Sequence, residues 1–270
     1  MDFKAFVIDM DGVLWHNVTP LPGLKDFFAT LENLELPFIL ATNNAMKVAE
    51  DYTEKLAGFG VEVAADRILT SSEAAASYLK GNYPNANEVY VVGEQGLHRA
   101  VREQGFEVVS PEAVRNGAFA PIVVTGLARE SLTYEMVAMA SLLVQKGADL
   151  VATNADSSYP TELGTMPGAG ALLSVITTAT GAEAFVVGKP KAAMFEEALK
   201  RLGTNASETA MIGDRLNTDI KGGKAAGMGT ILVLSGISSR EEVETSDDKP
   251  DFIFEDIQEI TAKLLEAANS

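Results

Sequence analysis

Short apolar runs recur along the chain, and polar side chains follow directly after several of them. Four such runs lie at residues 6–8, 37–41, 184–187 and 209–212. Continuous apolar runs of this length predict buried strands of a parallel sheet. Open parallel sheets bind ligands at the carboxyl ends of their strands, so the polar residues that follow predict one shared site. These residues are Asp9, Asp11, Thr42, Asn43, Lys189, Asp214 and Asp219.

The spacing between the runs predicts the domain organisation. Thr42 lies 33 residues after Asp9, which fits a single strand–helix–strand unit, and Asp214 lies 25 residues after Lys189. By contrast, 147 residues separate Thr42 from Lys189, far more than one crossover needs. The sequence therefore predicts a second domain inserted between these two positions.

The inserted segment has its own alternation of strand-like and helical patterns. Strands are predicted at residues 89–92, 106–109, 122–125 and 150–153, and helices near 96–103 and 133–146. We place the inserted α/β domain at residues 80–181 and a discontinuous core at residues 1–79 and 182–270. The predicted fold class is α/β, with a doubly wound parallel sheet in the core. Residues 235–249 are polar and acidic, and predict a solvated loop with a short helix.

Composition narrows the range of partners. The 270 residues fit two domains at about 150 residues each, and an apolar fraction of 47% is ordinary for globular proteins. The net charge is −17, whereas binding to nucleic acid or to an anionic membrane surface requires clustered Lys and Arg. Both kinds of partner are therefore excluded, and a small molecule is the expected one. The oligomeric state stays open, with a homo-oligomer among the alternatives.

The chain has no cysteine, so disulfides, thiolate catalysis and cysteine-bound metals are excluded. The first predicted strand begins within a few residues of the N-terminus, which leaves no room for a signal peptide. No apolar run reaches the roughly 18 residues that a membrane span needs. We expect a cytoplasmic protein.

The segment around Asp9 suggests a particular chemistry. In an extended chain the side chains of Asp9 and Asp11 point to the same side, so two carboxylates are delivered together at a strand end. Burying two like charges is costly unless a cation compensates, which favours a Mg²⁺ site beside a carboxylate nucleophile. A strand end followed by a polar turn at Gly12 is the alternative for this segment alone.

The other strand ends add the groups that a phosphate needs. A hydroxyl, an amide and an ammonium group, from Thr42, Asn43 and Lys189, can hold phosphate oxygens, while acids hold a metal. Backbone N–H groups near Gly12 would add further donors. Four such motifs in order are a strong signal, although each one alone is weak.

These motifs resemble the haloacid dehalogenase superfamily of phosphotransferases, and in particular its NagD-like or p-nitrophenylphosphatase subfamily. The resemblance covers about residues 4–257 and is carried by the sequences DMDGVL, TNN, GKP and GDRLNTDI at residues 9–14, 42–44, 188–190 and 213–220. It implies a Rossmann-like core with a type C2 cap, which is inserted after the second motif, as the long gap predicts.

The resemblance also implies roles for the site residues. Asp9 would be the nucleophile that forms an aspartyl-phosphate, and Asp11 the general acid and base. Mg²⁺ would be held by Asp9, Asp214 and the backbone carbonyl of Asp11, while Asp219 would orient ligand waters or Lys189.

In the cap, the resemblance places Asn154, Asp156, Gly168 and Gly170 over the site, where we expect them to help select the substrate. The alternative is that Asp156 caps a helix or turn, and that Gly170 permits a tight bend. We expect His16 to be structural or exposed, and the alternative is that Trp15 and His16, just after the first motif, shape the mouth of the cleft.

We therefore expect a Mg²⁺-dependent phosphatase that hydrolyses small organic phosphate monoesters, such as sugar phosphates or nucleotides. Two alternatives remain. One is a phosphotransferase on the same scaffold, and the other is a non-catalytic module that binds a metabolite. The four motifs do not identify the substrate.

Overall fold

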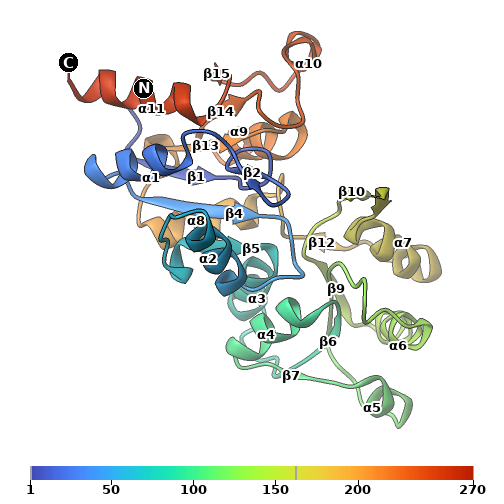
Figure 1. Ribbon diagram of the computed structural model, residues 1–270. Coiled ribbons are helices and arrows are strands. Elements are labelled where there is room, and N and C mark those ends of the chain that lie inside the picture. The colour runs from blue at the N-terminus through green and yellow to red at the C-terminus, as the bar shows by residue number, and fades with distance from the viewer. Residues whose placement is uncertain (1, 162, 270) are drawn as a thin grey trace. The chain divides into compact units, whose positions relative to one another are not determined.

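The computed structural model describes residues 2–161 and 163–269. Within it the chain forms two compact units, each built on its own parallel sheet (Figure 1). The first unit comprises the chain up to Thr42, Ala49–Leu69, and the chain from Lys189 onward. The second comprises Asn43–Val48 and Thr70–Gly188. The α/β class with parallel sheets is thus as predicted.

The six-stranded sheet of the first unit has the order β15-β14-β13-β1-β4-β5. Its inner strand β1 (Ala5–Ile8) is entirely buried and pairs in parallel with β13 (Thr209–Gly213) and β4 (Phe38–Thr42). These three strands correspond to the first, second and fourth apolar runs, and their carboxyl ends lead to Asp9, Asp214 and Asn43. The outer strands are β14 (Gly229–Val233), β15 (Phe252–Phe254) and β5 (Ile68–Thr70).

Amphipathic helices complete the first unit, and α1 (Leu24–Asn33) packs against α11 (Ile257–Ala268) through apolar side chains. A small hairpin of β2 (Trp15–His16) and β3 (Thr19–Pro20) follows Asp11. The other helices are α2 (Ala49–Gly58), α8 (Ala192–Leu202), α9 (Lys221–Ala225) and α10 (Arg240–Thr245), with 3₁₀ turns η1 (Ala65–Arg67) and η2 (Ala206–Glu208) and a π-helical turn η3 (Leu216–Ile220).

The second unit has a five-stranded sheet with the order β12-β9-β8-β6-β7, around a separate apolar core. Its strands are β6 (Glu88–Val92), β7 (Glu107–Val108), β8 (Ile122–Thr125), β9 (Asp149–Ala152) and β12 (Phe185–Val186). Its helices are α3 (Ser71–Asn82), α4 (Gln95–Glu103), α5 (Pro111–Arg115), α6 (Tyr134–Gln145) and α7 (Ala169–Thr180), and β10 (Ser158–Thr161) with β11 (Gly164–Pro167) forms an antiparallel hairpin. This unit includes residues 70–79 and 182–188, which the sequence analysis had left outside the insertion.

One strand prediction is wrong. The run before Lys189 forms only the two-residue strand β12, which pairs with β9 at the edge of the second unit's sheet, and Phe185 is 46% exposed. The prediction had placed this run among four buried strands of one sheet. A short apolar run shows that a strand is favourable, but it carries no information about which sheet the strand joins.

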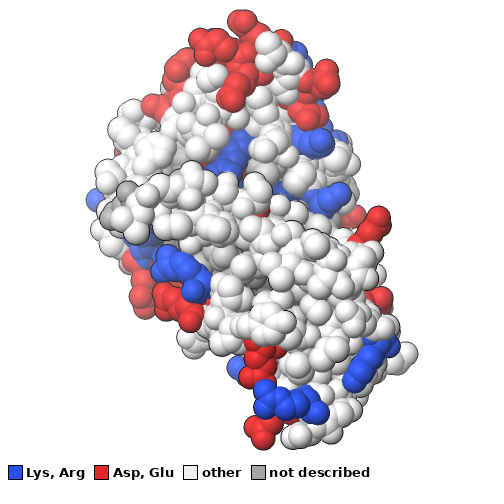
Figure 2. Space-filling view, turned by 90° about the vertical axis from the view of Figure 1, so that its right-hand side faces the viewer, with Lys and Arg blue, Asp and Glu red and all other residues white. Residues whose placement is uncertain are grey.

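On the face shown in Figure 2, acidic side chains gather at the upper end, and the basic ones are scattered in small groups. The excess of acidic over basic side chains in the whole sequence gives a net charge of −17. Among the helices described, none is both long enough and apolar enough to cross a membrane.

Candidate active site

Asp9 lies at the carboxyl end of the central strand of the first unit. The backbone N–H of Asp9 donates to the carbonyl of Ile212 in β13 at 2.8 Å. This bond continues the pairing of β1 with β13 and fixes the position of Asp9. The side chain is 13% exposed, and one carboxylate oxygen, Oδ1, accepts from the ammonium group of Lys189. The other oxygen makes no hydrogen bond within residues 2–161 and 163–269. Asp9 therefore has one oxygen held by Lys189 and one without a hydrogen bond among the described residues.

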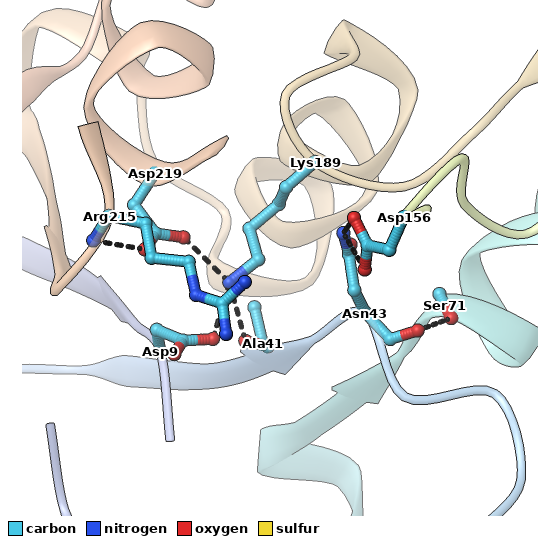
Figure 3. Close-up of polar contacts among 8 residues, drawn as sticks. All are labelled: Asp9, Ala41, Asn43, Ser71, Asp156, Lys189, Arg215 and Asp219. Carbon is cyan, nitrogen blue, oxygen red and sulfur yellow. Dashed lines mark hydrogen bonds and ion pairs between the residues drawn. The ribbon is translucent and has the colours of Figure 1, made fainter. Parts of the chain in front are cut away.

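Lys189 is the cation of this site and is only 3% exposed. Figure 3 shows its ammonium group between the carboxylates of Asp9 and Asp219, and the distance to Asp219 Oδ1 is 2.8 Å. It also donates to the carbonyl of Ala41 in β4 at 3.2 Å. Burial acts to lower the pKa of Lys189, but the two carboxylates outweigh it and raise that pKa above its ordinary value. The lysine is thus charged at neutral pH.

Asp214 follows β13 and is 1% exposed. Its Oδ2 accepts from the backbone N–H of Ile237 at 2.8 Å, whereas its buried Oδ1 has no hydrogen-bond partner among the described residues. Asp219, in η3, is also 1% exposed, but its Oδ2 accepts from the backbone N–H of Arg215 at 3.1 Å, and its Oδ1 faces Lys189. Asp214 therefore has a carboxylate oxygen to offer a ligand, while Asp219 is engaged within the protein.

Two glycines leave room for the Asp214 carboxylate. Gly12 has a φ of +87°, and a Cβ there would lie 2.4 Å from Asp214 Oδ2. A Cβ on Gly236 would lie 2.1 Å from the same oxygen. The hydroxyl of Ser235 donates to the carbonyl of Gly12 at 2.8 Å and joins the two loops. Glycine is therefore favoured at position 12 for two reasons: the backbone has a positive φ, and the Asp214 carboxylate lies where a Cβ would be.

The charges of this cluster do not balance. Asp9, Asp214 and Asp219 place carboxylate oxygens within 4.8 Å of one another, whereas Lys189 supplies one positive charge. Burial, reinforced by the neighbouring acids, raises the pKa of Asp9 well above its ordinary value. Burial and the charge of Asp219 raise the pKa of Asp214 to about 6. Arg215 adds a second positive charge, which acts to lower the pKa of Asp214. Three acids still outnumber the two cations, and oxygen donors with a surplus of negative charge fit a divalent cation.

Asp11 lies outside this cluster. Its side chain is exposed, and its Oδ1 accepts from the indole N–H of Trp15 at 2.8 Å. The expected Mg²⁺ contact from its backbone carbonyl stays a prediction. Thr42, at the end of β4, is 4% exposed.

A second polar cluster lies within the second unit and surrounds Asn43. The carbonyl of Asn43 accepts from Asn154 Nδ2 and from Ser71 Oγ, each at 2.7 Å. Its side-chain amide donates to the Asp156 carboxylate, at 3.3 Å to one oxygen (Figure 3). The Asp156 backbone N–H in turn donates to Asn154 Oδ1 at 3.0 Å. Asn154 and Asp156, which were predicted to help select the substrate, thus contact the expected phosphate-binding residue Asn43.

Known proteins resemble this chain over nearly its whole length. Family models described as haloacid dehalogenase-like hydrolase and as HAD-hydrolase-like match residues 6–107 and 186–260. An acid sugar phosphatase of Staphylococcus aureus (strain USA300) is 37% identical over 262 residues, covering 97% of this chain and 98% of that protein. The chain belongs to the haloacid dehalogenase-like hydrolases.

Further relatives place this hydrolase among the phosphatases. The 5′-nucleotidase YutF of Bacillus subtilis (strain 168) is 35% identical over 257 residues, which is 95% of this chain and 97% of the relative. The solved structure of NagD from E. coli K-12 superimposes with a TM-score of 0.87 at 32% identity, covering 96% of this chain and 98% of NagD. The chain is therefore a haloacid dehalogenase-like phosphatase of NagD-like type, as the motifs predicted.

The glycine-rich stretch of this phosphatase packs against the Asn154–Asp156 segment. A Cβ on Gly168 would lie 2.2 Å from the carbonyl oxygen of Asp156, and one on Gly170 would lie 2.3 Å from that of Ala155. The N–H of Gly170 also donates to the Asp156 carbonyl at 2.9 Å. These close contacts require glycine, so enlarging either residue would displace the neighbouring backbone.

Sequence reasoning missed the loop at residues 235–238, which was expected to be solvated. Ser235, Gly236 and Ile237 contact Gly12 or Asp214, and the Ser238 hydroxyl accepts from the backbone N–H of Leu216 at 3.1 Å. Only the short helix of this segment, α10, was anticipated. Small residues directly after β14, another strand of the same sheet, were the one available signal.

Proposed function

We propose that this phosphatase uses Mg²⁺ to hydrolyse small organic phosphate monoesters through an aspartyl-phosphate on Asp9. The observation that carries the proposal is the arrangement of four charged groups near the carboxyl ends of the central strands. Asp9 keeps one carboxylate oxygen unbonded, Lys189 holds the other, and Asp214 Oδ1 has no partner among the described residues. A nucleophile, a fixed cation and an open metal ligand are the parts that phosphoryl transfer requires.

In the first step, a carboxylate oxygen of Asp9 forms a bond to phosphorus as the ester P–O bond breaks. The leaving oxygen takes a proton from Asp11, and Lys189 keeps Asp9 in position. In the second step, a water molecule attacks phosphorus and gives its proton to Asp11. The Asp9–phosphorus bond breaks, which releases inorganic phosphate and restores both carboxyl groups.

The acidic cluster fits a divalent cation, for which Asp9 and Asp214 would be the ligands, with Asp219 holding Lys189. When bound, Mg²⁺ supplies charge neutralisation that lets an anionic phosphate approach an anionic nucleophile. Thr42, Asn43 and the N–H groups near Gly12 would bind phosphate oxygens. Each of these residues is a proposed ligand.

We assign the second unit as the cap of this enzyme, which leaves the chemistry to the first unit. The substrate class follows from relatives that act, by name, on sugar phosphates and on 5′-nucleotides. Those two names differ, so the proposal extends to small phosphate monoesters in general. The cytoplasmic location stays a prediction.

Released phosphate, measured across sugar phosphates, nucleoside monophosphates and p-nitrophenyl phosphate, tests the proposal. Activity should require Mg²⁺ and disappear with EDTA, and Asp9→Asn should reduce turnover at least about a thousandfold because the nucleophile is lost. Acid quenching of the wild type with ³²P-labelled ester should trap a phosphorylated protein that Asp9→Asn lacks. Undiminished hydrolysis by Asp9→Asn would refute the assignment, and transfer of phosphate to an added alcohol would favour a phosphotransferase.

A further inference from the structure

Trp15 is a fully buried side chain that contacts an exposed carboxylate. Its exposure is 0%, whereas Asp11 is exposed, and the indole N–H donates to Asp11 Oδ1 at 2.8 Å. Asp11 makes no other hydrogen bond through its side chain within residues 2–161 and 163–269. Trp15 is one of the two residues expected near the mouth of the cleft, and its ring lies in the core of the first unit.

The backbone between the two residues is fixed as well. The N–H of Gly12 donates to the carbonyl of Trp15 at 2.8 Å, and the N–H of Leu14 donates to that of Met10 at 2.8 Å. Asp11 and Trp15 also form an isolated β-bridge. The segment that carries Asp11 is thus a closed loop, tied by one backbone bond and one side-chain bond to the same tryptophan.

Helix α2 holds the indole ring in place. Tyr52 is buried and stacks on it with ring centroids 6.5 Å apart and planes 16° apart. The Lys55 ammonium group lies 4.0 Å from the ring centroid, and Phe59, just beyond the helix, packs at 6.0 Å. A ring packed on this many sides has a fixed orientation, so its N–H is a preorganised donor.

We propose that Trp15 is a positioning residue that orients the Asp11 carboxyl for proton transfer, which rests on the acid–base role assigned above. With Oδ1 occupied by the indole N–H, Oδ2 is the oxygen that carries the proton to the leaving group and accepts it from water. Without the indole, Asp11 is an exposed side chain that can rotate away from the leaving oxygen. Trp15 itself exchanges no proton.

This role can be tested by comparing the rates of aspartyl-phosphate formation from two esters whose leaving groups have similar shapes. Phenolate leaves less readily than p-nitrophenolate and therefore depends more on a proton from Asp11. Trp15→Phe keeps an aromatic ring but removes the N–H. It should slow aspartyl-phosphate formation from phenyl phosphate about tenfold more than from p-nitrophenyl phosphate, in single-turnover experiments with Mg²⁺.

Three companion variants separate the explanations. Asp11→Asn should show the same selective loss, and the double variant should be no worse than Asp11→Asn alone, because one pathway is removed in both. Phe59→Leu loosens the packing around the indole but keeps its N–H, so it should lower the melting temperature while preserving the ratio of the two rates. A changed ratio in Phe59→Leu would overturn the assignment to the hydrogen bond.

The outcomes distinguish this proposal from the proposed function. Equal losses for both esters in Trp15→Phe, together with a selective loss in Asp11→Asn, would overturn the role of Trp15 and leave the acid role of Asp11 intact. Equal losses in Asp11→Asn would refute the acid role itself, and the role of Trp15 with it.

A spectroscopic readout tests the hydrogen bond without catalysis. Trp15 is the only tryptophan in the chain, so a ¹⁵N-labelled protein has a single indole N–H resonance. Asp11→Ala should shift that resonance and speed its exchange with solvent. A resonance that is identical in the wild type and Asp11→Ala would overturn the proposal.

Discussion

The first unit gathers three buried charged side chains around Asp9, whereas the second unit surrounds Asn43 with amide, hydroxyl and carboxylate groups. In the second cluster, every contact described joins a donor to an acceptor, as in the bonds from Asn154 and Ser71 to the Asn43 carbonyl. In the first, three carboxylates lie together, and Lys189 pairs with two of them, Asp9 and Asp219.

The two clusters differ in charge, because three carboxylates meet in the first whereas Asp156 is the one charged side chain in the contacts described around Asn43. Buried polar groups normally find partners inside the protein, and a charge surplus persists only where something else compensates it. The acidic cluster could therefore bind a cation, whereas the contacts around Asn43 are hydrogen bonds among protein groups. Substitutions in the two clusters should have different consequences, and three experiments make the difference measurable.

The largest effect is expected from Lys189→Met, which removes the buried cation that pairs with Asp9 and Asp219. Loss of a buried partner costs about 3–5 kcal/mol of stability, and loss of one electrostatic contact costs about 10²- to 10³-fold in turnover. Denaturant unfolding in EDTA at neutral pH and phosphate release with Mg²⁺ measure the two effects. Lys191→Met, at an exposed lysine two residues away, is the matched control and should change stability by less than about 0.5 kcal/mol. Similar values for both variants would contradict the role of Lys189.

Part of the acidic cluster was predictable because Asp9 and Asp214 follow strands that a short run of neighbouring apolar residues identifies. Asp9 and Asp214 come directly after buried neighbouring strands, and parallel pairing of β1 with β13 brings their ends together. Lys189 also reaches this site, although its preceding strand belongs to the other sheet. The strand-end rule thus placed the residue near the site for a reason that the structure does not bear out.

Interactions made by backbone atoms and by tight loops could not be predicted in this way. The N–H of Ile237 reaches Asp214 from a loop with no recognisable motif, and any residue type offers such a donor. The bond from Trp15 to Asp11 depends on the φ of +87° at Gly12, which closes the loop between them. Sequence patterns report burial and periodicity, whereas these contacts depend on the path of individual loops.

A smaller and pH-dependent effect is expected from Asp214→Asn in the absence of metal. The pKa of Asp214 is about 6 in the folded protein against an ordinary value of 3.8, so the native state binds the proton more tightly. Its ionisation therefore lowers stability as pH rises from about 4 to 7, by at most about 3 kcal/mol. Asn cannot ionise and escapes this loss.

The stability of Asp214→Asn in EDTA, relative to the wild type, should thus increase between pH 4 and pH 7. Comparing the two proteins at each pH cancels the titration of other groups. Saturating Mg²⁺ should stabilise the wild type more than Asp214→Asn at pH 7, because only the wild type retains the proposed metal ligand. If the difference in stability between the two proteins does not change with pH, the pKa of Asp214 is not raised in the folded protein.

The smallest effect is expected in the second cluster, where Asp156→Ala removes the carboxylate that accepts from the Asn43 amide. The contact is long, at 3.3 Å, so the loss should be modest, about tenfold or less in kcat/KM. If Asp156 acts through Asn43, which is proposed to bind the phosphate common to every substrate, kcat/KM should fall by the same factor for sugar phosphates, nucleotides and p-nitrophenyl phosphate. Asp156→Asn keeps an acceptor oxygen and should restore most of the loss. If Asp156→Ala has a normal melting temperature but a changed ranking of kcat/KM across substrates, Asp156 instead recognises the leaving group, as the resemblance to the family had implied.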